Sequence, residues 1–299
     1  MFGLSITDFV LVSMTASSLA AADVLKVCLG LWDILRKTDI EARITPKRAA
    51  VFALGVVVCV FIYGCFEAWN VREVNVTIRT DKLPDGMDKL RIVQISDIHL
   101  GGIYYTSHLE RVMKVVRHAE PDILVLTGDL VDGNMKYRER EAKILSSHGA
   151  KYGAFAVTGN HEYYYNLDEA KEFIASSGFM LLDDEKIDVA GISITGLDDN
   201  TGVVLPHLYP AEGRFSIVLK HHPQIPKLKA GEFDLQLSGH THGGQIWLCN
   251  LAMERVYGVK QGLSRNGEGH VYVSNGAGFW GPPIRILATP EVTVFDLVR

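Results

Sequence analysis

The sequence predicts an α/β fold in which two packed sheets are flanked by helices and preceded by an apolar membrane region. Three observations lead to this prediction. Residues 49–66 carry no charged side chain, residues 91–177 alternate between short apolar runs and helical patterns, and strand-like runs crowd together after residue 178. Alternating patterns indicate strands joined by helices, whereas closely spaced strand patterns indicate a mostly β half.

Residues 1–69 are predicted to form the membrane region. The run Ala49–Phe66 is long enough to cross a bilayer core about 30 Å thick, at about 1.5 Å per helical residue. The alternative is a buried core helix, but a helix at the rim of a soluble domain carries a polar stripe that this run lacks. The segment Phe9–Trp32 contains Asp23 and Lys26, so it is expected to be either a first span or an interfacial helix.

The charges beside the apolar run predict its orientation. Basic residues lie between the two apolar segments at Arg36, Lys37, Arg43, Lys47 and Arg48. Cytoplasmic flanks of membrane helices are enriched in such residues, so everything after Glu67 is expected on the extracytoplasmic side of the cell membrane. Arg72, Arg79 and Lys82 on the other flank reduce this asymmetry.

Residues 70–299 are predicted to form the globular domain. Apolar runs rich in β-branched residues predict strands at 71–78, 91–96, 123–127, 154–157, 179–182, 192–195, 215–219, 235–237, 271–274 and 292–297. Apolar residues at helical spacing predict helices at 107–119, 138–147 and 167–177. The net charge of −5 provides no broad basic field, so nucleic acid is not expected as a bulk partner.

Five short polar motifs each follow a predicted strand. They are Asp97-Ile98-His99, Gly128-Asp129, Gly159-Asn160-His161-Glu162, His221-His222-Pro223 and Gly239-His240-Thr241-His242. Each motif alone occurs by chance in many proteins, but together they supply carboxylate, amide and imidazole ligands. This mixed set suits Mn²⁺, Fe or Zn²⁺ rather than Ca²⁺. The ends of strands are also where open α/β sheets bind ligands.

Two acidic residues have predicted geometric roles. Asp97 and His99 are two positions apart, so on a strand they would point to one side and bind the same cation. Asp129 ends the next strand, and its two carboxylate oxygens can bridge two cations. Two cations about 3.5 to 4 Å apart lower the pKa of a bound water and hold the attacking and leaving oxygens of a phosphate. The set predicts hydrolysis by hydroxide held between the metals, without a covalent enzyme intermediate.

The order of these motifs resembles that of the calcineurin-like metallophosphoesterase superfamily between Arg91 and Arg299. Gly239–Gln245 (GHTHGGQ) and Gly281–Arg285 (GPPIR) resemble its membrane-associated branch, transmembrane proteins with a metallophosphoesterase domain. The resemblance implies a four-layer α/β/β/α sandwich and a proton donor at His161. It also implies one metal bound by Asp97, His99, Asp129 and His242, and another bound by Asp129, Asn160, His221 and His240.

Three further residues are candidates for substrate binding. Lys220–Pro223 contains two histidines where the family pattern has one, and the usual spacing to proline selects His221 as the ligand. His222 would then be either a neighbour that supports the ligands or one on the substrate side. Tyr163 is expected either to line a substrate cleft or to pack in the fold. Arg285 is expected either to meet a phosphate oxygen through its planar guanidinium or to form a surface ion pair.

The leading functional hypothesis is a membrane-anchored, dinuclear phosphohydrolase that cleaves a phosphodiester or pyrophosphate bond. Its substrate would be a phosphorylated small molecule or a lipid-linked phosphate, because a tethered site meets bilayer substrates at high effective concentration. One alternative is a UDP-diacylglucosamine pyrophosphohydrolase of lipid A biosynthesis, whose substrate is expected in the cytoplasm, against the predicted orientation. Another is a noncatalytic membrane receptor or scaffold. That alternative predicts a lost ligand or acid, yet Asn160 and His161 are both present.

Overall fold

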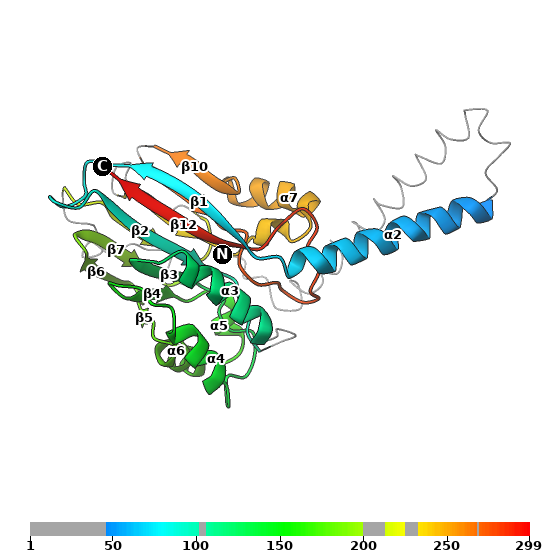
Figure 1. Ribbon diagram of the computed structural model, residues 1–299, viewed down its shortest axis with the longest axis horizontal. Coiled ribbons are helices and arrows are strands. Elements are labelled where there is room, and N and C mark those ends of the chain that lie inside the picture. The colour runs from blue at the N-terminus through cyan, green and yellow to red at the C-terminus, as the bar shows by residue number, and fades with distance from the viewer. Residues whose placement is uncertain (1–45, 102–105, 200–212, 225–232, 268) are drawn as a thin grey trace, which may run out of the picture. The chain divides into compact units, whose positions relative to one another are not determined.

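The computed structural model describes residues 46–101, 106–199, 213–224, 233–267 and 269–299. Figure 1 shows the strands and helices of a mixed α/β domain. The described strands form two sheets of six strands each. The chain divides into two compact units, residues 1–61 and 62–299. The predicted segment Phe9–Trp32 lies outside the described residues.

Helix α2 (Pro46–Ala68) contains the apolar run that was predicted to cross a membrane. Within it, Ala50–Ala68 is long and apolar enough to do so, judged by length and composition alone. Its large side chains are mostly exposed, with Phe52 at 74% and Phe66 at 70%. A core helix would bury such side chains, so this exposure argues against the core-helix alternative.

The first sheet has the strand order β1-β12-β2-β3-β4-β5. Its strands are β1 (Arg72–Arg79), β2 (Lys89–Ile95), β3 (Ile123–Thr127), β4 (Ala154–Val157), β5 (Met180–Leu181) and β12 (Glu291–Val298). Strands β2 to β5 pair in parallel, because each is reached through helices, as the alternating pattern predicted. The connecting helices are α3 (Thr106–His118), α4 (Glu139–Ser146), α5 (Asn160–Tyr164) and α6 (Leu167–Ser176).

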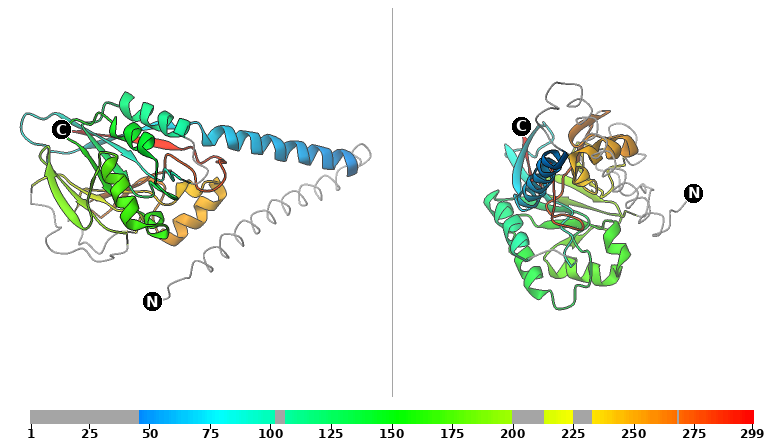
Figure 2. Two further views of the ribbon diagram at one scale, coloured as in Figure 1. Left: turned by 90° about the horizontal axis from the view of Figure 1, so that it is seen from below. Right: turned by 90° about the vertical axis from the view of Figure 1, so that its right-hand side faces the viewer.

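Helices α3, α4 and α6 share one apolar core with the first sheet. Leu109 and Val112 of α3, Leu145 of α4 and Ile174 of α6 are fully buried in this core with Ile95 of β2. Complete burial of each such side chain contributes about 1.5 to 3 kcal/mol to the free energy of folding. Figure 2 shows these helices, in teal and green, along the outside of the domain. The apolar residues whose helical spacing predicted these helices are therefore the residues that pack on the sheet.

The second sheet has the strand order β10-β11-β9-β8-β7-β6. Its strands are β6 (Glu185–Val189), β7 (Ile192–Gly196), β8 (Ser216–Leu219), β9 (Leu235–Ser238), β10 (Gly262–Asn266) and β11 (Gly269–Val273). The edge strands β6 and β10 were not predicted, because an edge strand needs no continuous apolar run. Two elements between β9 and β10 were also missed: the short 3₁₀ helix η3 (His242–Gly244) and α7 (Trp247–Tyr257).

The two sheets pack face to face. Ile92 and Ile123 of the first sheet and Ile194 of the second are fully buried in one common core. Val218 and Val271 point to the other face of the second sheet and form a smaller cluster there. The predicted α/β fold of two sheets with flanking helices is thus confirmed. Residues 200–212 and 225–232 lie outside the described residues, and the helical layer expected over that other face stays a prediction.

Candidate metal centre

Loops from both sheets carry the predicted ligands. Each ligand follows the C-terminal end of a strand: Asp97 and His99 follow β2, Asp129 follows β3, Asn160 follows β4, His221 follows β8, and His240 and His242 follow β9. Strands β2, β3 and β4 of the first sheet are parallel, and so are β8 and β9 of the second. The C-terminal ends of the parallel strands therefore meet at one edge of each sheet. Face-to-face packing of the sheets then brings all seven side chains together.

The first group of ligands is Asp97, His99 and His242. Nε2 of His99 lies 3.0 Å from Nε2 of His242, which lies 3.4 Å from Oδ1 of Asp97. All three residues are buried. Two ring nitrogens and a carboxylate oxygen that converge on one point form a donor set for a divalent transition-metal ion.

The second group is Asp129, His221 and His240, with Asn160 beside them. Nε2 of His221 lies 3.0 Å from Oδ2 of Asp129, and Nδ1 of His240 lies 2.9 Å from Oδ1 of Asn160. Nδ1 of His221 lies 2.7 Å from the carbonyl oxygen of Thr127, to which it can only donate. That hydrogen bond leaves the Nε2 lone pair for a metal, as in many metal-binding histidines.

Asp129 belongs to the second group and also faces the first. Its Oδ2 atom is 3.0 Å from Nε2 of His221 and 3.8 Å from Nε2 of His99. Its Oδ1 atom accepts a hydrogen bond of 2.9 Å from the backbone N–H of His161. The position of this carboxylate is therefore suited to contact ions in both groups.

Burial sets the protonation of most of the imidazoles. It lowers the pKa of His99 to about 4, and it lowers the pKa of His240 and His242 well below the ordinary value. Burial also raises the pKa of Asp97 to about 6. Neutral imidazoles beside crowded carboxylates are ready to bind a cation without first losing a proton.

His221 differs from the other imidazoles. Burial alone would lower its pKa, but the Asp129 carboxylate raises the pKa well above the ordinary value. The same interaction lowers the pKa of Asp129 despite its burial. Metal binding to such a pair releases the imidazole proton, so a cation would take the place of that proton. The donor atoms and their charges thus fit the divalent ions that the sequence predicted.

The backbone at the ligands is strained. Positive φ angles occur at Asp97 (55°), His99 (55°), Asp129 (52°), His240 (70°) and His242 (52°). Non-glycine residues in sparsely populated regions cost about 1 to 3 kcal/mol each and cluster at functional sites. Because β2 ends at Ile95, Asp97 and His99 lie in a loop. The expectation that strand alternation directs these two side chains was therefore wrong, since the turned loop does so.

Two motif glycines leave space for the carboxylates. A Cβ atom at Gly159 would lie 2.3 Å from Oδ1 of Asp129, and one at Gly239 would lie 2.3 Å from Oδ2 of Asp97. Any side chain at these positions would displace an acidic ligand. This close approach explains why a glycine precedes both Asn160 and His240.

His161, the predicted proton donor, lies next to the first group. Its ring centroid is 4.6 Å from that of His99, and its Nδ1 lies 2.8 Å from Oδ1 of Asp132. Burial would lower the pKa of His161, but the hydrogen bond to Asp132 and the Asp129 charge raise it above the ordinary value. Asp132 was not predicted, although its place in the loop that carries Asp129 was a usable signal.

Glu162 connects two of the ligand loops and was also missed as a site residue. Its Oε2 accepts hydrogen bonds from the backbone N–H groups of Asp129 (3.0 Å) and Gly159 (2.6 Å). Its Oε1 accepts one of 3.1 Å from the N–H of Val131. Glu162 therefore holds the loop after β3 against the loop after β4. Its presence at the fourth position of the GNHE motif was the signal in the sequence.

Of the other two candidates for substrate binding, His222 lies beside the second group of ligands, and Tyr163 contacts Asp198. His222 is half-buried beside the second group, with its ring centroid 3.8 Å from that of His240 and its Nδ1 2.6 Å from Oδ2 of Asp199. The hydroxyl of Tyr163 donates to Asp198. The neighbouring Tyr164 has its ring centroid 5.0 Å from that of His161 and is 49% exposed.

Arg285 does not have the position that was expected. It is fully buried, and its guanidinium donates to the carbonyl oxygens of Gly278 (2.6 and 2.9 Å), Ala288 (2.9 Å) and His242 (3.2 Å). Its Nη2 also lies 3.1 Å from Nδ1 of His242. Both expected roles, a contact to substrate phosphate and a surface ion pair, are therefore wrong. Arg285 instead fixes the loop and the ring of His242.

Replacing Arg285 by methionine is expected to lower the free energy of unfolding by about 2 to 4 kcal/mol, because several buried carbonyl groups lose their donors. Chemical denaturation of the full chain measures this loss. Arg140→Met is the matched control, since the Arg140 side chain is 71% exposed and forms an ion pair with Glu110. Equal stability of the two variants would contradict the structural role of Arg285.

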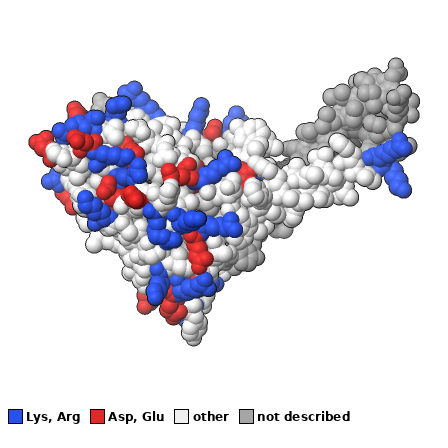
Figure 3. Space-filling view, in the orientation of Figure 1, with Lys and Arg blue, Asp and Glu red and all other residues white. Residues whose placement is uncertain are grey.

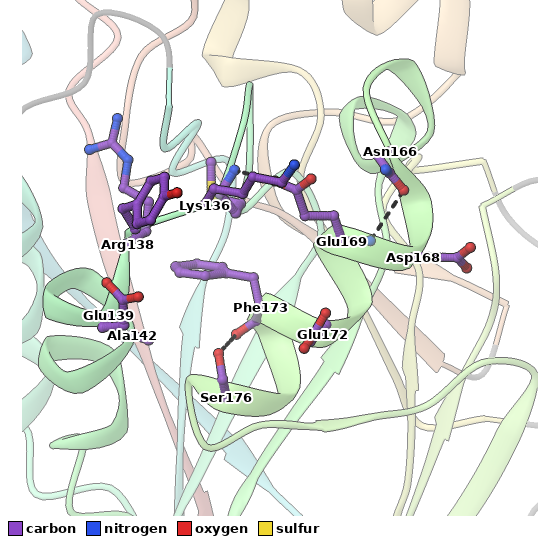
Figure 4. Close-up of a pocket in the computed structure, with 12 residues that line it drawn as sticks. Lys136, Arg138, Glu139, Ala142, Asn166, Asp168, Glu169, Glu172, Phe173 and Ser176 are labelled. Atoms are coloured by element: carbon purple, nitrogen blue, oxygen red, sulfur yellow. Dashed lines mark hydrogen bonds between the residues drawn. The ribbon is translucent and has the colours of Figure 1, made fainter.

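A separate cavity of about 650 Å³ lies between α4 and α6. Figure 4 shows Phe173 and Arg138 at this cavity, and Asn166 accepting a hydrogen bond of 3.2 Å from the backbone N–H of Glu169 at the start of α6. Among the described residues, the predicted ligands do not line it. The cavity is therefore a different place from the ligand cluster.

Comparison with known proteins agrees with this arrangement. The model of the family "Calcineurin-like phosphoesterase" matches residues 90–244. The chain is 35% identical over 248 residues to an uncharacterized metallophosphoesterase of Aquifex aeolicus, covering 79% of this chain and 95% of that protein. It is 31% identical over 272 residues to the transmembrane protein with metallophosphoesterase domain of Danio rerio, covering 82% of this chain and 62% of that protein.

Among solved structures, TT1561 of Thermus thermophilus is similar, with 14% sequence identity and a TM-score of 0.41. The similarity covers 63% of this chain and 90% of that chain.

Proposed function

This chain belongs to the calcineurin-like phosphoesterase family and is a metal-dependent phosphoesterase, and from that premise we propose that it hydrolyses a phosphodiester or pyrophosphate bond at a membrane. The observation that carries the proposal is the convergence of the ligand groups from both sheets on Asp129. Retention of every predicted ligand and of His161 argues against a noncatalytic receptor or scaffold.

Two divalent ions are proposed: Asp97, His99 and His242 would hold one, Asn160, His221 and His240 would hold the other, and Asp129 would contribute to both. When bound, such ions supply Lewis-acid activation of a water nucleophile and positive charge beside the phosphate. Manganese is the ion we would test first, because the ligands are mixed oxygen and nitrogen donors.

His161 is proposed to donate a proton to the leaving oxygen. Its Nδ1 hydrogen bond to Asp132 orients the ring and favours the protonated imidazole. General acid catalysis of this kind contributes about 10²- to 10⁴-fold to rate. Asp132 would act as a positioning residue, because its carboxylate contacts the ring of His161.

The substrate is proposed to be lipid-linked, and the catalytic domain to lie on the extracytoplasmic side of the cell membrane. Support comes from the length and apolar composition of α2 and from the relatives in fish and cattle that are named transmembrane proteins. A site tethered to the bilayer meets lipid-linked substrates at high effective concentration.

Removal of metal from the full chain in detergent is expected to abolish hydrolysis of a chromogenic phosphodiester, and added Mn²⁺ is expected to restore it. Fe²⁺ and Zn²⁺ are tested in parallel. Undiminished turnover after exhaustive chelation would contradict the proposed metal-dependent reaction. A panel of lipid diphosphates and phosphomonoesters then identifies the bond, and a C-terminal reporter fusion that is active only outside the cytoplasm tests the orientation.

A further inference from the structure

Helix α7 turns an apolar surface toward solvent. Trp247 (49% exposed), Leu248 (58%), Leu251 (56%) and Val256 (72%) lie on one half of the helix, and none of its residues is buried. A helix that packs on its own domain buries such side chains instead. Exposed apolar patches of this kind mark interaction surfaces.

The side of α7 that faces the domain is only half-buried and includes two hydrophilic side chains. Asn250 and Glu254 are half-buried, and the Asn250 amide donates to Oε1 of Glu254 at 3.2 Å. The helix ends in a left-handed Gly258. Cys249, Met253 and Tyr257 are half-buried on the same side. The exposed apolar residues are Trp247, Leu248, Leu251 and Val256, and Arg255 is the one exposed charge of the helix.

The start of α7 is paired with the segment that contacts the end of α2. The backbone N–H of Trp247 donates to the carbonyl of Ile286 at 2.9 Å, and that of Arg285 donates to the carbonyl of Gly64 at 3.0 Å. A Cβ atom at Gly64 would lie only 2.7 Å from Ile284. All of these contacts lie within the unit of residues 62–299.

Further apolar side chains adjoin this contact. Ile62 is 61% exposed, Phe66 is 70% exposed and Leu287 is 64% exposed. We define the apolar face by its six largest members: Ile62, Phe66, Trp247, Leu248, Leu251 and Leu287. In Figure 3 the end of the domain from which Ile62–Ala68 emerges is mostly white, whereas charged side chains gather on the left and lower parts.

We propose that the apolar face docks on the lipid bilayer, so that the catalytic domain lies against the membrane surface instead of projecting from it. The choice of lipid as partner rests on continuity, because Ile62 and Phe66 belong to the helix that is long and apolar enough to cross a membrane. Tryptophan and leucine with a nearby basic residue, here Arg255, are the side chains that interfacial helices place at the headgroup level. This inference rests on the membrane anchor in the proposed function and is independent of the reaction.

The apolar face also borders the metal centre. The Gln245 side chain accepts from the N–H of Trp280 and donates to its carbonyl, both at 2.9 Å. The Trp280 ring is 41% exposed, and its centroid is 6.2 Å from that of His161. Docking would therefore present the metal centre to a phosphate in the headgroup region while the acyl chains of that substrate stay in the bilayer.

Depth-dependent quenching in proteoliposomes tests the docking. The full chain carries a fluorescent label at Leu251→Cys, with its native cysteines replaced by serine, in phosphatidylcholine vesicles with brominated acyl chains. We expect quenching at least about threefold stronger than for a label at Met180→Cys, because interfacial helices bury their apolar face about 5 to 10 Å deep. Met180 is the matched control, since it is 53% exposed and lies on the edge strand β5.

Equal quenching at the two positions in protein that floats with the vesicles would overturn the docking while leaving the anchor intact. Failure of the chain to float with vesicles would overturn both. A label at Leu251 that is unquenched by bromine but shielded from water in a cross-linked dimer would instead identify a second copy as the partner, and this also overturns the proposal.

A second measurement uses Leu248→Glu with Leu251→Glu, two exposed positions outside the metal centre. Turnover of a chromogenic phosphodiester lipid in vesicles is expected to fall about tenfold or more. The reason is that transfer of one leucine side chain from water to the bilayer strengthens binding by about tenfold or more. Turnover of a soluble diester should stay within about twofold, as it should for the control Met180→Glu. An equal loss on both substrates would contradict docking, whereas a wild-type chain inactive on both would contradict the proposed reaction alone and leave quenching to decide.

Discussion

An Asp129→Ala chain is expected to lose metal from both ligand groups and at least about a thousandfold in turnover of a phosphodiester. The reason is the central position of the Asp129 carboxylate, which lies 3.0 Å from His221 and 3.8 Å from His99. Elemental analysis after gel filtration should find close to two divalent ions per wild-type chain and fewer than one in the variant. The same samples provide the kinetic comparison.

Asp188→Ala is the matched control for this experiment. Asp188 is exposed and forms an ion pair of 2.6 Å with Arg214, so its loss should leave metal content and turnover unchanged. Circular dichroism checks that the Asp129 variant is folded, and Asp129→Asn provides a second variant of nearly identical shape. Two tightly bound ions in a folded Asp129→Ala chain would refute the bridging role.

A His161→Gln chain is expected to keep its metals but to lose about 10²- to 10⁴-fold in turnover of substrates with a poor leaving group. His161 lies beside the first ligand group without being one of the predicted ligands, and its hydrogen bond to Asp132 supports the protonated ring. The loss should be much smaller for 4-nitrophenolate, because that leaving group needs no proton. A plot of rate against leaving-group pKa measures the difference.

His118→Gln is the control, because His118 is exposed at the end of α3. An equal loss for good and poor leaving groups in the His161 variant would exclude a role as proton donor. A fall in metal content of that variant would indicate a ligand role instead. Asp132→Asn should show the same dependence on leaving group with a smaller loss.

The sequence predicted the elements that have a buried face. The run Ile123–Thr127 is buried at every position, so its β-branched and aliphatic side chains report the strand directly. The edge strand β6 has only half-buried and exposed positions, and its sequence shows no apolar run. Helix α7 was missed for a related reason, because it buries no residue and Trp247, Leu248, Leu251 and Val256 are exposed.

The sequence also predicted which residues have metal-binding chemistry but not how they are supported. The motifs are local, so each one can be recognised within a few residues. Their partners are not local: Arg285 meets His242 across 43 positions, and Glu162 meets the N–H of Asp129 across 33. A lone arginine near the C-terminus has no periodic or spacing signal that distinguishes a buried role from a surface one.

By itself, the sequence determined the order of strands and helices with buried faces, the apolar helix and the identity of the ligand-type side chains, because each depends on neighbours along the chain. Only the tertiary structure decided that His99 and His242, 143 positions apart, face one another at 3.0 Å, that Arg285 is internal, and that Trp247, Leu248 and Leu251 of α7 are exposed. Those features depend on how two sheets pack, and packing is set by contacts between segments that are distant in the chain.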